Sequence, residues 1–249
     1  MIRAMPELPV STIKNKLRSE IWNSLEEHNL ARFPRPVYDR IPNFAGAEKA
    51  AVRIRELKEF IEADVVKVNP DAPQAYVRQI VLEEGKTLLM PTRRISAGFL
   101  RLDSKRIPQQ MIRKAISISG AFKMGQRITV SKLPTVDLII AGSVAVSLEG
   151  GRIGKGEGYS EIEYGVLRES GLVDDKVRIA TTVHDCQLVD AFPVERHDLP
   201  VDYVLPPTKL YETKTRLSRP KGIYWELVTP EMLRKIPVLA EVRAKSQPK

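Results

Sequence analysis

Cysteine, aromatic residues and long apolar runs are all scarce in this 249-residue sequence, and each scarcity excludes a kind of protein. With one cysteine, Cys186, there is no intramolecular disulfide and no cysteine-based metal site. Aromatic residues make up 6%, so the core must come mainly from Val, Ile, Leu and Ala. The longest uncharged run, 138–148, is short of the roughly 18 apolar residues that span a bilayer. Met1–Val10 lacks the apolar centre of a signal peptide. We therefore expect a soluble, cytoplasmic protein without a membrane partner.

The charge balance is basic, which favours an anionic partner. Lys and Arg number 40 against 31 Asp and Glu, a net charge of +9, in an otherwise ordinary globular composition. Residues 209–249 hold ten basic and four acidic residues, so much of the excess lies in this tail. Such asymmetry attracts nucleic acid, a nucleotide or a folate polyglutamate, although many soluble proteins are basic without a specific partner. The tail lacks the aromatic pattern of RNA-binding modules, so RNA is the less favoured partner.

Alternating helix and strand patterns predict a parallel α/β sheet. Apolar residues at helical spacing predict helices over 11–28 and 45–61, and Ser11 is the expected N-cap of the first. The β-branched residues at 64–68 indicate a strand. A helix at 74–84, ended by Gly85, and a strand at 87–90 continue the alternation. Later segments extend it: helices at 109–117 and 161–170, and strands at 136–141, 177–183 and 203–205.

We expect one three-layer α/β/α, Rossmann-like domain with a mostly parallel sheet over residues 1–208. Residues 209–249 form a basic, Pro- and Lys-rich extension that either packs back on this domain or stays mobile. No internal repeat or low-complexity segment interrupts the chain.

A glycine-rich segment, 150–161, has the physical properties of a phosphate-binding loop. Five of the 14 glycines fall between Gly150 and Gly158, after a strand and before a helix. Glycine allows positive φ, and the first amides of a helix are free to meet an anion. Arg152 and Lys155 add positive charge. A mobile turn with no ligand is the alternative, because neither the Walker A spacing nor G-x-G-x-x-G is present.

Acidic residues follow this segment directly. Ser160 and Glu163 have the spacing of a capping box, and Glu161 falls in the first turn of the expected helix. A carboxylate beside a bound phosphate would repel it unless a divalent cation lay between them. Glu161 is therefore a candidate Mg²⁺ ligand.

These residues resemble the 5-formyltetrahydrofolate cyclo-ligase family, also called methenyltetrahydrofolate synthetase, whose loop reads G-x-R-[LI]-G-x-G-x-G-Y-Y-D. Residues 150–161 read GGRIGKGEGYSE. Weaker matches follow in the family's order: Lys14 with Arg18, Gly85-Lys86 with Pro91, Asp137-Leu138-Ile139, Gln187, and 201–205. Residues 142–147, 183–187 and 219–223 are similar to the methenyltetrahydrofolate synthase domain-containing subgroup.

The resemblance implies a fold, cofactors and a reaction. The family has an α/β/α sheet and uses Mg-ATP to phosphorylate the formyl oxygen of 5-formyltetrahydrofolate. Atom N10 then attacks the activated carbon, and phosphate leaves to give 5,10-methenyltetrahydrofolate and ADP.

The resemblance also implies roles for individual residues. ATP would be held by Lys14, Arg18, Arg152, Gly154, Lys155, Gly156 and Gly158. Lys155 and Arg152 would be the catalytic residues, Glu161 the metal ligand, and Tyr159 a substrate contact. From helical spacing alone, Lys14 and Arg18 would instead be two exposed positions one turn apart.

The sequence departs from the family where the substrate would bind. The family's Tyr-Tyr-Asp is Tyr159-Ser160-Glu161, which loses one aromatic ring and lengthens the metal carboxylate. After the first strand, only Asp71 offers a carboxylate to the folate pocket. The nucleotide half thus matches better than the pterin half. Two alternatives stay open: a related ATP-dependent enzyme acting on another pterin, and a non-catalytic nucleotide- or RNA-binding protein with the same fold.

Histidine and cysteine come together at 184–186, which has two interpretations. Cys186 could be a nucleophile with His184 as its base. We favour a buried cysteine and a histidine at the carboxyl edge of the sheet, where ligands bind, so that His184 contacts the substrate. His28 and His197 lie in polar surroundings typical of the surface.

Overall fold

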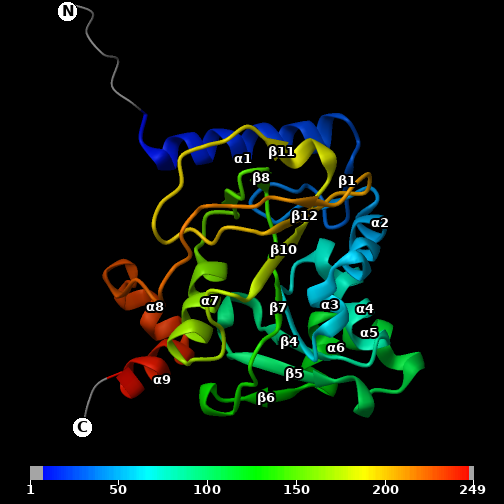
Figure 1. Cartoon of the computed structure of the whole chain (residues 1–249), viewed down its shortest axis with the longest axis vertical. Helices are drawn as coiled ribbons and strands as arrows, with labels where there is room; N and C mark the ends of the chain where they lie inside the picture. Colours follow the sequence, from blue (N-terminus) through cyan, green and yellow to red (C-terminus); the bar gives the residue numbers. More distant parts are fainter. Residues whose placement is uncertain (1–7, 247–249) are drawn as a thin grey trace, which may run out of the picture.

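A computed structural model describes residues 8–246 of the protein. Residues 1–7, and with them most of the segment assessed for a signal peptide, lie outside the described residues, as do 247–249. An eight-stranded sheet forms the centre, in the order β13-β12-β10-β7-β3-β4-β5-β6 (Figure 1). Its strands are β3 (Val65–Val68), β4 (Thr87–Pro91), β5 (Phe99–Asp103), β6 (Gln126–Ile128), β7 (Leu138–Ile140), β10 (Arg178–Thr182), β12 (Tyr203–Leu205) and β13 (Tyr211–Glu212). The middle five are parallel, whereas β5, β6 and β13 add antiparallel edges.

Helices cover both faces of this sheet, each over its own apolar core (Figure 1). One face carries α2 (Ala47–Val52), α3 (Lys58–Glu62), α4 (Ala75–Glu83), α5 (Ile112–Ala115) and α6 (Ile118–Met124). The other carries α7 (Tyr159–Glu169), α8 (Pro230–Lys235) and α9 (Pro237–Ser246). The expected three-layer, mostly parallel α/β/α architecture is confirmed.

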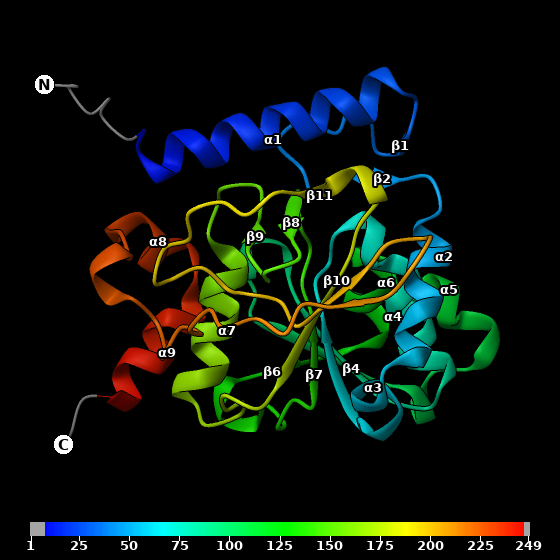
Figure 2. The ribbon, with the colours of Figure 1, turned by 45° about the horizontal axis from the view of Figure 1, so that its top comes forward.

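An additional, smaller layer lies beyond the carboxyl end of the sheet. Helix α1 (Val10–Glu27) crosses above it, as Figure 2 shows. Beneath α1 are a small sheet and a short β-pair: β11 (Leu188–Val189), β8 (Ala145–Ser147) and β9 (Arg152–Ile153), then β1 (Ala31–Arg32) with β2 (Asn43–Phe44). Trp22 and Leu25 of α1 pack with Phe44 and Ile153 in a separate core. This core fixes α1 over the glycine-rich segment.

Most expected elements are present, and the exceptions have local causes. The expected helix over 45–61 is three pieces, since Leu57 turns extended (ψ 124°) between the 3₁₀ turn Arg53–Glu56 and α3. Helix α1 starts one residue before Ser11, after Pro9, with no side-chain cap, so the predicted N-cap is wrong. Strands β5 and β6 were not expected. They are antiparallel additions at an edge, outside the β–α alternation that guided the prediction.

The C-terminal segment packs back on the rest of the chain. Strand β13 adds to the sheet beside β12, and α9 packs against α7. Ile236, Leu239 and Val242 are buried in the same core as α7. Among the described residues, no helix has the length and apolar content needed to cross a bilayer.

Candidate active site

A cavity of about 480 Å³ lies between the carboxyl ends of β3 and β4, the start of α7 and one side of α1. The segment 154–158 leads from β9 into α7 along its wall. Gly156 (φ +95°) and Gly158 (φ +71°) have left-handed backbones, and Gly158 is the N-cap of α7. The first α7 amide bonded to the backbone is that of Ile162, which donates to the Gly158 carbonyl. The amides just before it are the ones that a helix N-terminus offers to an anion.

The capping box predicted from Ser160 and Glu163 is wrong. Both residues lie inside α7, because the helix begins at Tyr159 with glycine as its cap. Ser160 Oγ instead accepts a hydrogen bond from Asn69 Nδ2 (3.0 Å). Glu163 is buried and pairs with Lys67 of β3. The side chains expected to cap the helix therefore tie it to the end of the neighbouring strand.

Two cations of α1 reach the cavity. Lys14 is buried, and its Nζ contacts Glu195 Oε2 (2.8 Å) and Asp198 Oδ2 (2.5 Å). Arg18 Nε donates to the Gly154 carbonyl (2.7 Å). Burial lowers the pKa of Arg18, while the carboxylates of Asp198 and Glu161 oppose that shift. These residues are not the exposed pair that helical spacing alone indicated.

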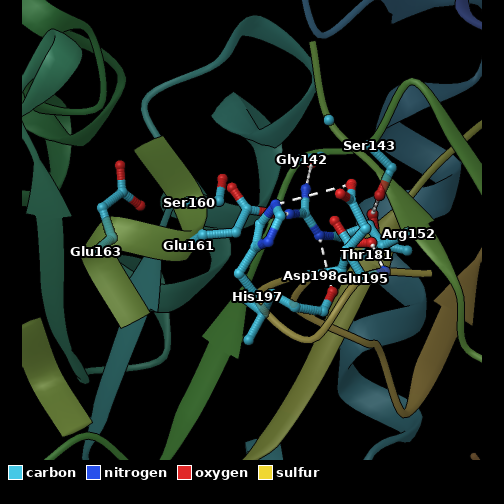
Figure 3. A network of polar contacts seen from close by, with 12 residues as sticks. Gly142, Ser143, Arg152, Ser160, Glu161, Glu163, Thr181, Glu195, His197 and Asp198 are labelled. Atoms are coloured by element: carbon cyan, nitrogen blue, oxygen red, sulfur yellow. Dashed lines mark hydrogen bonds and ion pairs between the residues drawn. The ribbon is translucent and has the colours of Figure 1, made fainter. Parts of the chain in front are cut away.

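Arg152 is buried, and Figure 3 shows it at the centre of a network of polar contacts. Its Nε donates to the Leu199 carbonyl (3.1 Å) and its Nη1 to the Gly142 carbonyl (2.9 Å). Its Nη2 pairs with the Glu161 carboxylate. The candidate metal ligand and a candidate ATP contact thus form an ion pair at the cavity wall.

Lys155 lies nearer the mouth of the cavity. It pairs with Glu157, which also accepts a hydrogen bond from Arg94 Nη2 (2.7 Å). Burial alone would raise the pKa of Glu157, but the bonds from Lys155 and Arg94 outweigh it and hold that pKa below its usual value. Tyr159, half-buried, follows on the same wall.

Three residues of the cavity were missed by the sequence analysis. Glu195, His197 and Asp198 place their ligand atoms within 4.8 Å of one another. His197 therefore borders the cavity, although its polar sequence neighbours indicated the surface. No familiar metal-binding spacing marks this segment, and its position follows from the path of the chain between β11 and β12.

The floor of the cavity is polar and is lined by Asn69, Asp71 and Glu163, of which only Asp71 was expected to contact a ligand. Lys67 Nζ donates to Asn69 Oδ1 (2.6 Å) besides pairing with Glu163. Burial raises the pKa of Glu163, against the charge of Lys67. Burial likewise raises the pKa of Asp71, against the nearby Lys155 and Arg78. The sequence signal for this floor was one lysine inside an otherwise β-branched strand, 65–68.

The structure does not bring His184 to this cavity. The residue caps the 3₁₀ turn Asp185–Gln187, and its Nδ1 accepts the backbone N–H of Cys186 (3.2 Å). Its ring packs edge-on against Phe44. Burial raises the pKa of the Cys186 thiol, which disfavours the thiolate. The geometry provides no activated cysteine nucleophile here.

The remaining candidate residues converge on one place. Cations from α1, β9 and the glycine-rich segment surround the N-terminus of a helix at the carboxyl edge of a parallel sheet. That edge is where open α/β sheets bind ligands, and this combination of groups suits phosphate. The chain is therefore of the class of α/β proteins with a glycine-lined ligand cavity that contains both cations and carboxylates.

Comparison with known proteins defines the family. The profile of the 5-formyltetrahydrofolate cyclo-ligase family matches residues 10–207. The chain therefore belongs to this family of ligases, and the resemblance found in the sequence is confirmed.

Individual relatives agree with this assignment. The chain is 44% identical over 241 residues to the methenyltetrahydrofolate synthase domain-containing protein of Mus musculus, covering 94% of this chain and 64% of that protein. The Homo sapiens protein of that name is 42% identical over 245 residues, covering 96% and 63%. The chain thus spans less than two thirds of these curated relatives.

A solved structure shows the same fold. It is the NMR structure of 5,10-methenyltetrahydrofolate synthetase from Aquifex aeolicus, with a TM-score of 0.51. The match covers 83% of this chain and 95% of that one at 19% identity.

Proposed function

We propose that the chain catalyses the ATP- and Mg²⁺-dependent conversion of 5-formyltetrahydrofolate to 5,10-methenyltetrahydrofolate. The observation that carries this proposal is the convergence of Lys14, Arg18, Arg152 and Lys155 on the turn before α7, within one cavity. Family membership supplies the reaction class. The formyl oxygen attacks the γ-phosphorus of ATP and ADP leaves. Atom N10 then attacks the formyl carbon and loses its proton, and the carbon–oxygen bond to phosphate breaks, so that phosphate leaves.

The residues of the cavity would mainly position phosphate and neutralise its charge. In the structure each of Lys14, Arg152 and Lys155 forms an ion pair with a carboxylate. A bound triphosphate offers these cations stronger, multiply charged acceptors. Lys155, nearest the mouth, would follow the transferring phosphoryl group. Arg152, held by two backbone carbonyls, keeps a fixed position beside the start of α7.

Glu161 and Asp198 would hold Mg²⁺. Both are carboxylates on the cavity wall, and their side chains are 19% and 13% exposed. Oxygen ligands from one or two carboxylates, completed by phosphate, are what this ion prefers in proteins. When bound, Mg²⁺ neutralises phosphate charge. The expected metal role of Glu161 thus gains a partner, Asp198, that the sequence analysis did not identify.

The test is the near-ultraviolet absorbance of the methenyl product after mixing protein, Mg-ATP and 5-formyltetrahydrofolate. We expect an ATP-dependent rise, reduced about 100-fold in rate in Glu161→Gln, the scale on which one electrostatic contact to the reacting group acts. Asp175→Asn is the matched control, because Asp175 is 74% exposed and pairs with Arg168 at the surface. That variant should keep its activity.

Two results would contradict the proposal. A flat trace together with ATP binding in calorimetry would support a related enzyme that acts on another pterin. Absence of both turnover and ATP binding would support a protein that keeps the fold without catalysis.

A further inference from the structure

A second cationic region lies away from the cavity, in residues 101–132. This stretch holds eight basic residues and one acidic residue, Asp103, a net charge of +7 in a chain whose total is +9. All eight cations are exposed: Arg101, Lys105, Arg106, Arg113, Lys114, Lys123, Arg127 and Lys132. The excess charge is therefore concentrated here more than in the tail, to which the sequence analysis had drawn attention.

The region lies along one edge of the sheet, where Arg127 is on the face that carries α6 and Arg101 is on the opposite face. Strand β6 pairs with β5, and Gly125, which follows α6, packs against Leu102 of β5. Helices α5 and α6 contact each other, and the Lys114 carbonyl accepts from the Ser117 hydroxyl at the start of α6. In Figure 1 these elements lie together in the lower part of the molecule, whereas α1 lies at the top. We call the surface of α5, α6 and the β5–β6 edge the cationic edge.

Its cations have few partners of their own. Arg106 approaches Asp103 at 3.6 Å, and Arg127 lies over the Phe122 ring at 5.1 Å. Among the described residues, the other six form no ion pair or hydrogen bond through their side chains. By contrast, the tail uses Arg219 and Lys235 in ion pairs with Asp202 and Glu231. Like charges held together without counter-charges disfavour the folded chain, unless an anionic partner binds them.

The exposed apolar side chains of the cationic edge indicate what kind of anion fits. Phe122 and Ile118, on α6, are 37% and 42% exposed. An aromatic ring next to cations is the platform on which an unpaired base stacks. Two apolar side chains on a seven-residue helix are too few for the large apolar face with which helices enter a bilayer.

We propose that the cationic edge binds single-stranded nucleic acid, through phosphate contacts with its cations and stacking of a base on Phe122. This surface is separate from the cavity, so the proposal does not depend on the proposed function. It also differs from recognition by the tail, since the tail has a smaller net charge and two of its cations, Arg219 and Lys235, are in ion pairs.

The first test is fluorescence anisotropy of a labelled single-stranded oligouridylate with the 249-residue chain at increasing salt. With about five phosphate contacts, the binding constant should fall roughly 100-fold between 50 and 200 mM salt. No saturable binding at the lowest salt would overturn the proposal. Tighter binding to phosphatidylserine vesicles than to the oligonucleotide would also overturn it, in favour of a membrane surface.

Matched charge variants locate the site. Lys123→Gln/Arg127→Gln should weaken binding about tenfold and reduce the salt slope by about 1.4. Lys221→Gln/Arg234→Gln removes the same charge from exposed tail positions. This variant should leave the binding affinity and the salt slope almost unchanged. Equal losses in the two variants would show that overall charge, not the cationic edge, attracts the oligonucleotide.

A second pair separates stacking from charge. Phe122→Ala should weaken binding about tenfold without changing the salt slope, because a ring contributes stacking and no charge. Ile118→Ala, on the same helix and similarly exposed, should have little effect. Circular dichroism checks that each variant is folded. An unchanged affinity in Phe122→Ala would remove the stacking part of the proposal.

Discussion

Arg152 and Lys67 carry their charges into the interior, and each meets one carboxylate of α7 there. Arg152 pairs with Glu161 and Lys67 with Glu163, two residues further along the helix. One pair joins the helix to β9 and the other joins it to β3. The first turns of α7 are thus held on both sides by ionic contacts in a region of low dielectric, which fixes the amides that would receive phosphate.

Removing the charge of Lys67 should destabilise the fold strongly. Lys67→Met leaves Glu163 buried without its partner, which should lower the free energy of unfolding by about 3 kcal/mol in urea titration. Lys67→Met/Glu163→Leu removes both charges and should recover most of that loss. Lys235→Met, which breaks an exposed pair with Glu231, serves as control and should cost less than about 1 kcal/mol. A double variant no more stable than Lys67→Met would contradict this account.

Tyr203 should make stability depend on alkaline pH. Burial and the hydrogen bond that its Oη donates to Glu59 Oε1 (2.9 Å) raise the pKa of Tyr203 to about 12. An unfolded tyrosine ionises near pH 10, so the unfolded chain releases its proton first and the free energy of unfolding falls between pH 10 and about 12. Allowing for solvent screening, we expect a fall of about 1 kcal/mol.

Tyr203→Phe isolates this effect. The variant loses one hydrogen bond at neutral pH, yet it has no phenol to ionise, so its stability curve should approach that of the unmodified chain above pH 10. Denaturant titrations at several pH values provide the comparison. Curves that stay parallel across this range would show that the raised pKa of Tyr203 has no effect on stability.

At the scale of elements, the junction between β9 and α7 depends on backbone conformation as well as on side chains. Gly158 caps the helix in the left-handed region, and a Cβ built there meets nothing within 4 Å. A Cβ on Gly156 would lie 3.3 Å from Arg18 Cζ. At Gly158 the turn therefore needs glycine because of its positive φ. At Gly156 it needs glycine for its positive φ and also because a guanidinium approaches closely.

Gly158→Ala should cost about 1 kcal/mol of stability from the left-handed backbone and should also weaken ATP binding, because the helix amides would shift. Gly171→Ala is a close control: its φ is +69°, its Cβ also meets nothing within 4 Å, and it follows the far end of α7. The two variants should lose similar stability in thermal unfolding, but calorimetry should show weaker ATP binding only for Gly158→Ala. Equal ATP affinities would mean that the turn does not hold phosphate.

At the scale of the whole molecule, two apolar cores lie on the faces of the central sheet and a third lies under α1, and the C-terminal segment contributes to the core under α7. Gly165 of α7 shows how closely this segment approaches, because a Cβ there would lie 3.0 Å from the Gly222 carbonyl. The extension expected from composition thus shares a core with the α/β domain. Its edge strand, β13, also pairs with β12.

This packing predicts that the chain unfolds as one unit. Leu239→Ala, in the interior of the α7 core, should lower the free energy of unfolding by about 2–5 kcal/mol in a single transition. Leu227→Ala, 49% exposed in the same C-terminal segment, should have an effect below about 1 kcal/mol. Two separate calorimetric transitions, with only the smaller one moved by Leu239→Ala, would instead show an independent tail.

Much of the fold was predictable from local sequence patterns. Strands 64–68, 87–90 and 203–205 and the helix over 74–84 were predictable because alternating apolar segments and glycine stops act over a few residues. The edge strands β5 and β6 were not, because their pairing depends on partners brought by the sheet. The glycine-rich segment was recognisable for the same local reason, and its position before α7 agrees with the structure.

The sequence by itself determined the fold class, the family and the glycine-lined turn, since each is written in contiguous residues. Only the tertiary structure decided which charges meet. Lys14 lies 181 residues from Glu195, and Lys67 lies 96 from Glu163, yet each pair is in contact. Ionic contacts of this kind leave no repeating pattern in the sequence, because they depend on how the sheet and α1 are placed in space. The same placement gathers the cationic edge and keeps His184 out of the cavity.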